Sequence, residues 1–240
     1  MTSYQEQAEI YKDGSTTCEG WSVWQSGGGK KPCVIVGHDW AGLLDGTRDH
    51  ARAIADMGYV AFAADVYGQG KRGTPGADNS SFMGPFMADR AVLRARLLAA
   101  VDAAKRHSQV DASRIAFIGF CFGGLCALDL ARANADVRGV VSLHGVYATP
   151  ELGPQQPIKP KILVCHGWDD PLAKPNDVFG LTRELTDAKA DWQLHAYGHT
   201  LHAFTSVGAD VPAMGAKYSV AAHRRSFAAM KDFLTEVLAS

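Results

Sequence analysis

The feature that most constrains the fold is an alternation, from about residue 32 onward, of short apolar runs with segments of helical periodicity. Runs such as YVAFAAD at 59–65 and RIAFIGF at 114–120 are typical of strands buried on both faces. Because strands joined by crossover helices run parallel, the pattern predicts an α/β fold, with a mostly parallel sheet and helices on both of its faces. The expected strands cover 33–40 (running into a loop), 59–65, 114–120, 137–145, 161–167 and 191–197, and the expected helices 47–58, 88–107, 124–134, 177–190 and 218–240.

Two of these helices have a clear apolar face. Apolar residues recur at 93, 97, 101 and 104 in the helix 88–107, and at 227, 230, 234 and 237 in the last helix. Since this spacing places them on one side of a helix, we expect these positions to face the core.

The N-terminal part follows another pattern. TTCEGWSVWQSGGGKKPCVIV, at 16–36, predicts an antiparallel hairpin that turns at Gly27–Gly29 on one edge of the sheet. Residues 68–88 and 148–160 are rich in Gly and Pro and predict long loops that shape a pocket or a lid. No repeat or linker divides the chain, so we expect a single domain over residues 1–240.

Charge and composition exclude several function classes. The net charge is −1 and Lys and Arg form no run, so the electrostatic footprint of a nucleic-acid-binding protein is absent. No apolar run is long enough to span a bilayer, and MTSYQEQAEIYKDG does not resemble a signal peptide. Five cysteines without paired spacing predict free thiols and a cytoplasmic location. The sequence leaves the oligomeric state open.

The segment most informative about function is Gly119-Phe120-Cys121-Phe122-Gly123, followed by Gly124. In a nucleophile elbow a strand turns abruptly into a helix, and glycines two residues before and after the nucleophile give the backbone room to turn. A helix N-terminus beside Cys121 would favour its thiolate and bind an oxyanion. The alternative is a buried apolar Cys at an ordinary strand–helix junction.

An elbow needs an acid and then a His later in the chain. Asp169 and Asp170 follow the strand 161–167, and we prefer Asp170, which precedes Pro171, although both carboxylates also suit a turn or helix cap. For the base, His195 lies inside a strand, whereas His199 and His202 follow it in a loop, and the residues alone do not separate those two. Their H-x-x-H spacing lacks a third ligand nearby, so we do not expect zinc.

These motifs resemble those of the dienelactone hydrolase family, whose members have the α/β-hydrolase fold and a Cys-Asp-His triad. Its G-x-C-x-G-G matches Gly119–Gly124, and its H-G-x-x-D matches His166, Gly167 and Asp170. The family's catalytic His precedes a small residue and Phe, which selects His202, followed by Ala203 and Phe204. The resemblance covers nearly the whole chain and implies a triad of Cys121, Asp170 and His202.

The same resemblance extends to the loop in VIVGHDWAGL. It implies an acid at Asp39 that contacts the nucleophile and an oxyanion site made by the N–H groups of Trp40 and Phe122. The family usually has Glu where this chain has Asp39, which is one methylene shorter; the alternative for Asp39 is a carboxylate that caps the loop.

Two departures from the family bear on the substrate. The lactone-cleaving type enzyme has an Arg four residues after its catalytic His, where this chain has Ser206, and the pocket loop GTPGADNSSFMGPFM lacks a second Arg. Without a guanidinium clamp we expect an uncharged or weakly polar ester or lactone. Arg72 and Arg90 flank the pocket loop, and the alternative for each is a solvated side chain. The hypothetical pocket lining, which is equally compatible with plain core, is Phe82, Met83, Phe86 and Met87.

Two other motifs suggest different chemistry. GQGKRG at 68–73 matches a dinucleotide fingerprint, but that site needs a helix to begin at once, and Pro75 and Gly76 follow instead. Cys126, five residues after Cys121, does not face it on a helix, so a redox pair is not expected.

The sequence thus predicts a hydrolase of small carboxylic esters or lactones that needs no metal or cofactor. Its alternative is a non-catalytic protein on a hydrolase fold that binds a small molecule.

Overall fold

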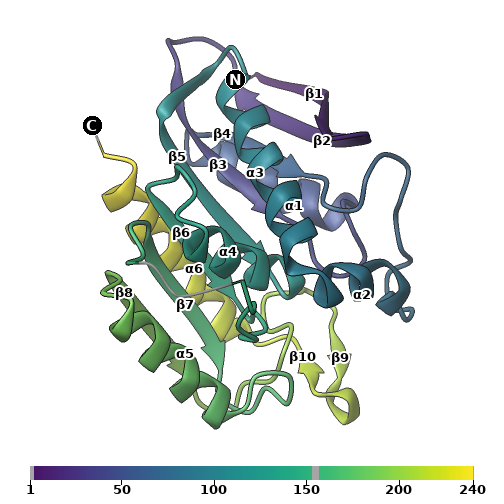
Figure 1. Cartoon of the computed structure of the whole chain (residues 1–240), viewed down its shortest axis with the longest axis vertical. Helices are drawn as coiled ribbons and strands as arrows, with labels where there is room; N and C mark the ends of the chain where they lie inside the picture. Colours follow the sequence, from purple (N-terminus) through teal and green to yellow (C-terminus); the bar gives the residue numbers. More distant parts are fainter. Residues whose placement is uncertain (1–2, 153–156, 240) are drawn as a thin grey trace.

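The computed structural model describes residues 3–152 and 157–239 and contains an eight-stranded mixed sheet (Figure 1). The strand order is β1-β2-β4-β3-β5-β6-β7-β8, and the strands from β4 to β8 pair in parallel. Their bounds are β1 Tyr4–Asp13, β2 Thr16–Gln25, β3 Lys31–Gly37, β4 Val60–Ala64, β5 Val110–Phe120, β6 Gly139–Leu143, β7 Lys161–Gly167 and β8 Trp192–Tyr197. The mostly parallel sheet predicted from the sequence is therefore confirmed.

Helices cover both faces of the sheet. On one face α3 (Arg90–Arg106), α4 (Phe122–Arg132) and α5 (Pro175–Asp187) bury side chains in one core cluster. On the other, α1 (Asp45–Asp56) and α6 (Val220–Val237) contribute to a second cluster. Figure 1 shows α4 in front of the central strands and α6 behind them. The apolar faces predicted for two helices lie inward: Leu93, Leu97, Val101 and Ala104 are buried, as are Met230, Leu234 and Val237, and Phe227 is partly buried.

The predicted hairpin at 16–36 is wrong. The antiparallel edge exists, but β2 pairs with β1 and β4, while β3 pairs in parallel with β4 and β5. The chain turns back at Gly14, where φ is 55°, rather than at Gly27–Gly29. β1 escaped detection because most of its residues are exposed and its sequence, YQEQAEIYKD, is mostly polar.

Two further elements lie in stretches predicted to be loops or left unassigned. Within 68–88 the structure has α2 (Ser80–Ala88), which contains Gly84 and Pro85. After β8 a small hairpin is formed by β9 (Asp210–Val211) and β10 (Ala216–Lys217), with a 3₁₀ turn at Pro212–Met214 between them. The predicted loop 148–160 has neither helix nor strand in its described part, and 153–156 lie outside the described residues.

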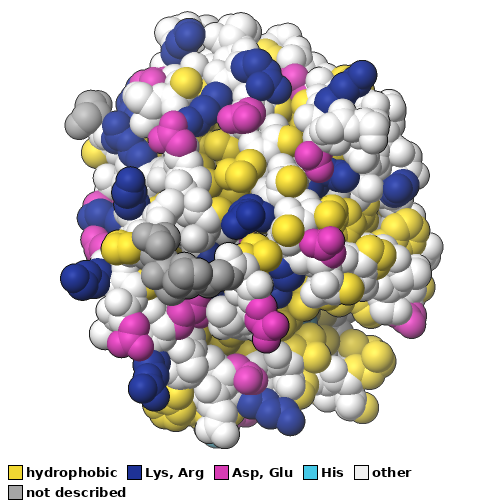
Figure 2. Space-filling model, viewed as in Figure 1, with side chains coloured by type: hydrophobic (Ala, Val, Ile, Leu, Met, Phe, Trp, Pro, Cys, Tyr) yellow, Lys and Arg dark blue, Asp and Glu magenta, His cyan; other side chains and the backbone are white. Residues whose placement is uncertain are grey.

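The surface and the cysteines agree with the composition. On the face seen in Figure 2, basic and acidic side chains are interspersed. All five cysteines are free, and the four other than Cys121 are buried. Within 3–152 and 157–239, the structure contains no helix long and apolar enough to cross a membrane.

Candidate active site

The sharpest backbone feature of the fold lies between β5 and α4. Phe120 ends the strand, Phe122 begins the helix, and Cys121 between them has φ 55° and ψ −115°. A non-glycine residue with positive φ is strained, so the surrounding structure must hold it in place. The N–H of Cys121 donates to Leu143 O at 3.1 Å and to Nδ1 of His144 at 3.2 Å. The side chain is partly exposed, as a nucleophile must be.

Glycines are required at this corner because backbone packs directly against backbone. A Cβ on Gly119 would lie 2.0 Å from Gly123 O, and one on Gly123 would lie 2.5 Å from Gly37 O. A Cβ on Gly124 would lie 2.7 Å from the Cα of Gly145. The G-x-C-x-G-G pattern is thus a packing requirement of the turn.

An acid and a base meet beside this corner. Asp170, three residues beyond the end of β7, is buried, and its Oδ2 lies 2.7 Å from Nδ1 of His202. Its Oδ1 accepts a hydrogen bond from the N–H of Leu172 at 2.8 Å. Each carboxylate oxygen therefore has a defined partner, and the ring of His202 is held with Nε2 directed away from Asp170.

The backbone around His202 is also fixed. Its N–H donates to Gly215 O at 2.9 Å, and its carbonyl accepts from the N–H of Lys217 at 3.0 Å. A Cβ on Gly167 would lie 2.6 Å from Thr200 O, so the end of β7 packs closely against the loop that carries His202. The small β9–β10 hairpin, which the sequence did not reveal, therefore holds the backbone of His202.

The electrostatics of His202 connect it to the thiol. Burial lowers its pKa, but the neighbouring Cys121 and the hydrogen bond to Asp170 outweigh burial and raise the pKa to about 10. Nε2 of His202 is buried and has no hydrogen-bond partner of normal geometry among the described residues. The thiol is thus near enough to act on the ring, and the raised pKa means that the ring is protonated at neutral pH. Contacts of this kind are often loose without substrate.

The other two histidine candidates lie elsewhere. His199 is fully exposed, and its Nδ1 lies 3.9 Å from the carboxylate of Asp169. His195 belongs to β8 and contacts Gln193 at 3.3 Å. The structure therefore brings His202, not His199, to Asp170.

The two N–H groups predicted to bind an oxyanion, those of Trp40 and Phe122, lie in segments that follow neighbouring strands. Gly37 of β3 and Gly119 of β5 are paired in register, so the loops that follow these strands start side by side. In the described part of the chain, neither the N–H of Trp40 nor that of Phe122 donates to a protein acceptor. Free N–H groups beside a nucleophile, one of them at a helix N-terminus, are suited to an oxyanion.

Asp39 lies at the surface of the loop that follows β3. Its carboxylate is exposed, and Oδ1 accepts a hydrogen bond from the N–H of Ala41 at 2.8 Å, as in the loop-capping alternative. No hydrogen bond joins it to Cys121 among the described residues, so its contact with the nucleophile stays a prediction.

Comparison with known proteins agrees with this arrangement. The profile of the dienelactone hydrolase family matches residues 20–238. The chain belongs to the dienelactone hydrolase family. A solved structure described as a dienelactone hydrolase-like promiscuous phosphotriesterase from metagenomic libraries is 36% identical, with a TM-score of 0.91 over 98% of both chains.

Two curated proteins are similar to this chain over shorter stretches. An uncharacterized protein of Caenorhabditis elegans is 34% identical, covering 61% of this chain and 95% of that protein. A carboxymethylenebutenolidase homolog of Mus musculus is 25% identical, covering 72% of this chain and 70% of that protein. This dienelactone hydrolase family protein is therefore a hydrolase with the α/β-hydrolase fold.

Two residues of this hydrolase's site were missed by sequence reasoning. His144 follows β6, and its Nε2 lies 2.7 Å from Oγ1 of Thr205, while its Nδ1 accepts the Cys121 N–H. Burial, together with the charge of His202, holds the pKa of His144 well below its usual range, so its ring is neutral. Tyr67, after β4, donates its hydroxyl to Trp40 O at 2.9 Å. A histidine directly after a central strand was the only available signal.

Two of the residues predicted to line the pocket pack against Tyr67. Phe82 and Phe86 of α2 stack on its ring at 5.8 and 5.6 Å, and Phe122 stacks on it at 5.8 Å. Phe86 is buried, whereas Phe82, Met83 and Met87 are partly buried against the core. An aromatic cluster therefore extends from α2 to the elbow as part of the core, and its role as a pocket lining stays a prediction.

Both arginines that flank the predicted pocket loop are paired with carboxylates; Arg90 is not solvated, contrary to one expectation, and Arg72 is partly exposed. Arg90 is buried and forms a bidentate pair with Asp129, at 2.7 and 2.6 Å. Arg72 pairs with Asp65 at 3.2 Å. Because each guanidinium already has a carboxylate partner, neither is free to hold a substrate anion.

The motifs that suggested other chemistry do not form such sites. Glycines at 68–73 are not followed by a helix, since α2 begins only at Ser80. Over the two described ranges, no three His, Cys, Asp or Glu side chains group as metal ligands. Cys126 is buried within α4.

Proposed function

We propose that this hydrolase cleaves small uncharged carboxylic esters or lactones through a thioester on Cys121. The observation that carries the proposal is the strained, partly exposed Cys121 beside a buried His202 whose Nδ1 lies 2.7 Å from Asp170. A nucleophile next to a base that a third group orients is the arrangement that covalent acyl transfer requires.

In the first half-reaction, His202 holds the proton of Cys121 on Nε2 as an ion pair with the thiolate, and the sulfur attacks the carbonyl carbon. The resulting oxyanion accepts hydrogen bonds from the N–H groups of Trp40 and Phe122. When the tetrahedral intermediate collapses, the C–O bond to the alcohol breaks, and His202 returns the proton to the leaving oxygen.

In the second half-reaction, His202 takes a proton from water, whose oxygen attacks the thioester carbonyl. The C–S bond breaks, the acid leaves, and the proton on His202 returns to the sulfur. Asp170 keeps the proton of Nδ1 in place and stabilises the imidazolium at both stages. None of these steps needs a metal or a cofactor.

The preference for uncharged substrates rests on the arginines. Arg90 and Arg72 are paired with Asp129 and Asp65, and Ser206 stands four residues after His202. An anionic lactone would therefore lack a charge-assisted partner. The five free thiols support the cytoplasmic location predicted from the sequence.

A phosphotriester is a second candidate substrate class. The metagenomic relative, similar over 98% of both chains, is described as a promiscuous phosphotriesterase. Such a triester is uncharged, and thiolate attack at phosphorus would use the same three side chains. We expect hydrolysis of the triester to be slower than that of a carboxylic ester. The reason is that a phosphorylated thiol has no planar carbonyl group for the water activated by His202 to attack.

The proposal is tested by hydrolysis of a short-chain p-nitrophenyl ester. We expect Cys121→Ala to abolish turnover with an almost unchanged melting temperature, His202→Ala to do likewise, and exposed His199→Ala to keep full activity. Turnover by Cys121→Ala would refute the nucleophile, and loss of activity in His199→Ala alone would refute the base. A non-catalytic binding protein would show no turnover and no rapid, pH-dependent alkylation of Cys121 by iodoacetamide.

A further inference from the structure

We propose that His38 is a positioning residue for the oxyanion site: its neutral ring holds the peptide unit between Asp39 and Trp40 so that the Trp40 N–H faces the substrate carbonyl. The inference rests on the proposed function, since it assigns a role in stabilising the oxyanion formed there. It concerns a side chain that touches neither the thiol nor the substrate.

The contacts of the ring fix its tautomer. Nδ1 of His38 lies 2.6 Å from the carbonyl oxygen of Asp39, which only accepts, so Nδ1 carries the proton and donates. Nε2 lies 3.2 Å from the N–H of Val66, which only donates, so Nε2 is unprotonated and accepts. Both ring nitrogens therefore form hydrogen bonds, Nδ1 only as a donor and Nε2 only as an acceptor.

The hydrogen bond that holds the Asp39 carbonyl also fixes the direction of the Trp40 N–H. A trans peptide unit is planar, so its C=O and N–H point in opposite directions. When His38, together with the N–H of Gly42 at 3.2 Å, holds the oxygen on one side, the Trp40 N–H is directed to the other. Accepting two hydrogen bonds also polarises the amide and strengthens its N–H as a donor.

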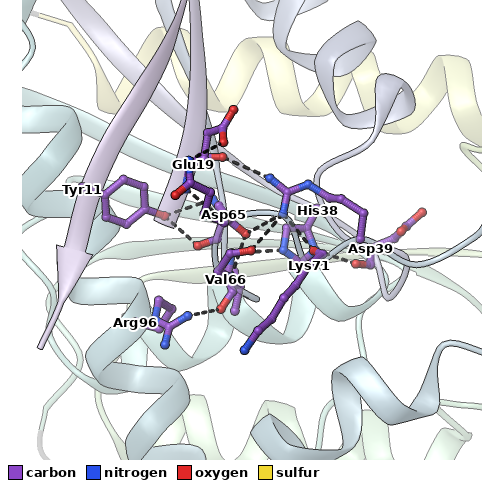
Figure 3. Close-up of polar contacts among 11 residues, drawn as sticks. Tyr11, Glu19, His38, Asp39, Asp65, Val66, Lys71 and Arg96 are labelled. Atoms are coloured by element: carbon purple, nitrogen blue, oxygen red, sulfur yellow. Dashed lines mark hydrogen bonds and ion pairs between the residues drawn. The ribbon is translucent and has the colours of Figure 1, made fainter. Parts of the chain in front are cut away.

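The far side of the ring is anchored to a rigid segment. Val66, which donates to Nε2, has its own carbonyl bonded to Nη1 of Arg96 at 2.7 Å. The preceding Asp65 exchanges two backbone hydrogen bonds with the hydroxyl of Tyr11, at 2.7 and 3.0 Å. Figure 3 shows these contacts converging from several elements on the two residues that follow β4. The carboxylate of Asp65 accepts further bonds from Glu19 N, Gly68 N and Nη1 of Arg72.

The surroundings keep the ring neutral. It is buried and lies edge-on to Tyr67 at 4.7 Å. Burial lowers the pKa of His38 more than the Asp39 carbonyl and the carboxylates of Asp65 and Asp39 raise it, and Arg72 lowers it further. A proton on Nε2 would also face the N–H of Val66, so the charged ring does not fit its place.

Two amide substitutions of His38 distinguish the roles of its two ring nitrogens. In His38→Asn the side-chain NH₂ occupies the region of Nδ1 and keeps a donor for the Asp39 carbonyl, whereas His38→Gln places its amide oxygen near Nε2 and loses that donor. Two rates are measured in each variant: acylation by a p-nitrophenyl ester, which forms an oxyanion, and alkylation of Cys121 by iodoacetamide, which does not.

We expect His38→Gln to slow acylation by about 10- to 100-fold, His38→Asn to stay within about threefold of the wild type, and alkylation to change less than about twofold in both. Equal losses of acylation in the two variants, or a parallel loss of alkylation, would overturn the assignment. Failure of the proposed function looks different, since Cys121→Ala would then still hydrolyse the ester.

A measurement on the wild-type chain keeps the inference testable if His38→Gln does not fold. Nitrogen-15 chemical shifts of the His38 ring at neutral pH should show a protonated Nδ1 and a bare Nε2. The opposite tautomer, or a charged ring, contradicts the assignment.

Discussion

The carboxylate of Asp170 lies 2.7 Å from Nδ1 of His202, although the two residues follow different strands, β7 and β8. Parallel neighbours in the sheet bring their carboxyl ends to the same edge, and the elbow after β5 reaches that edge as well. This one contact directs Nε2 of His202 away from Asp170, so in the proposed mechanism it governs how well His202 works as the base.

Replacing the carboxylate tests that contact. We expect Asp170→Asn to lower kcat by about 10²- to 10⁴-fold, because an amide neither stabilises the imidazolium nor enforces a proton on Nδ1. It should also lower the pKa of His202, which Asp170 helps to raise, and shift the pH dependence of Cys121 alkylation. Asp169→Asn is the matched control, since Asp169 is exposed; an equal loss there would contradict the assignment.

Stability should fall on acidification, in part through His50. Burial, aided by the charge of His223, lowers its pKa to about 4, whereas the unfolded value is 6.5. Between these values the unfolded chain binds more protons, so the free energy of unfolding decreases as pH falls through this window. His50 stacks on Phe120 at 3.9 Å, and His50→Phe keeps a ring there.

We expect His50→Phe to reduce the stability lost between pH 7 and pH 5 by about 1–2 kcal/mol, measured by urea unfolding at both values. An identical loss in the variant and the wild type would show that His50 is not the titrating group.

The surroundings of two glycines, Gly123 at the elbow and Gly180 in α5, predict opposite effects of an added methyl group. Gly123→Ala places a Cβ 2.5 Å from Gly37 O, so we expect a loss of about 3 kcal/mol or more and a displaced oxyanion loop. Gly180 lies exposed in α5 with nothing within 4 Å, so Gly180→Ala should add up to about 1 kcal/mol. Thermal unfolding and ester hydrolysis check both; a tolerated Gly123→Ala would contradict the packing argument.

Substrate charge is tested at Ser206. Because Arg72 and Arg90 are paired with carboxylates, the wild type should hydrolyse a neutral ester faster than its carboxylate-bearing analogue. Ser206→Arg should raise kcat/KM for the anionic analogue about tenfold with little change for the neutral one, through a charge-assisted contact. Ser206→Gln, of similar length without charge, is the control; equal gains in both would exclude an effect of charge.

The sequence predicted those features that local pattern determines. The apolar strands and the inward positions Leu93, Leu97 and Val101 follow from burial, and the glycines around Cys121 follow from the space a sharp turn needs. Strand pairing was misread where burial gave no signal. β1 is polar because it lies at the exposed sheet edge, and nothing in the sequence of β2 shows that β4 separates it from β3.

Within the site, the sequence pointed to side chains whose residue type and motif suggest a chemical role. It did not point to side chains whose proposed role depends on the groups they contact in the folded chain. Asp170 and His202 were marked by order and motif. His38 and His144 depend on the Val66 N–H, the Asp39 carbonyl and the Thr205 hydroxyl, groups that tertiary folding brings to them. α2 was missed because Gly84 and Pro85 lower helix propensity, while packing of Phe86 against Tyr67 compensates.

The central claim is that an acyl group passes through the sulfur of Cys121, and rapid-quench mass spectrometry tests it most directly. The protein is mixed with excess p-nitrophenyl acetate, quenched in acid during the p-nitrophenol burst and digested. The account predicts one acetyl group per chain on the peptide containing Cys121, appearing no more slowly than the p-nitrophenol burst. Steady release of p-nitrophenol with no acetyl on Cys121, or acetyl on another residue, would contradict it.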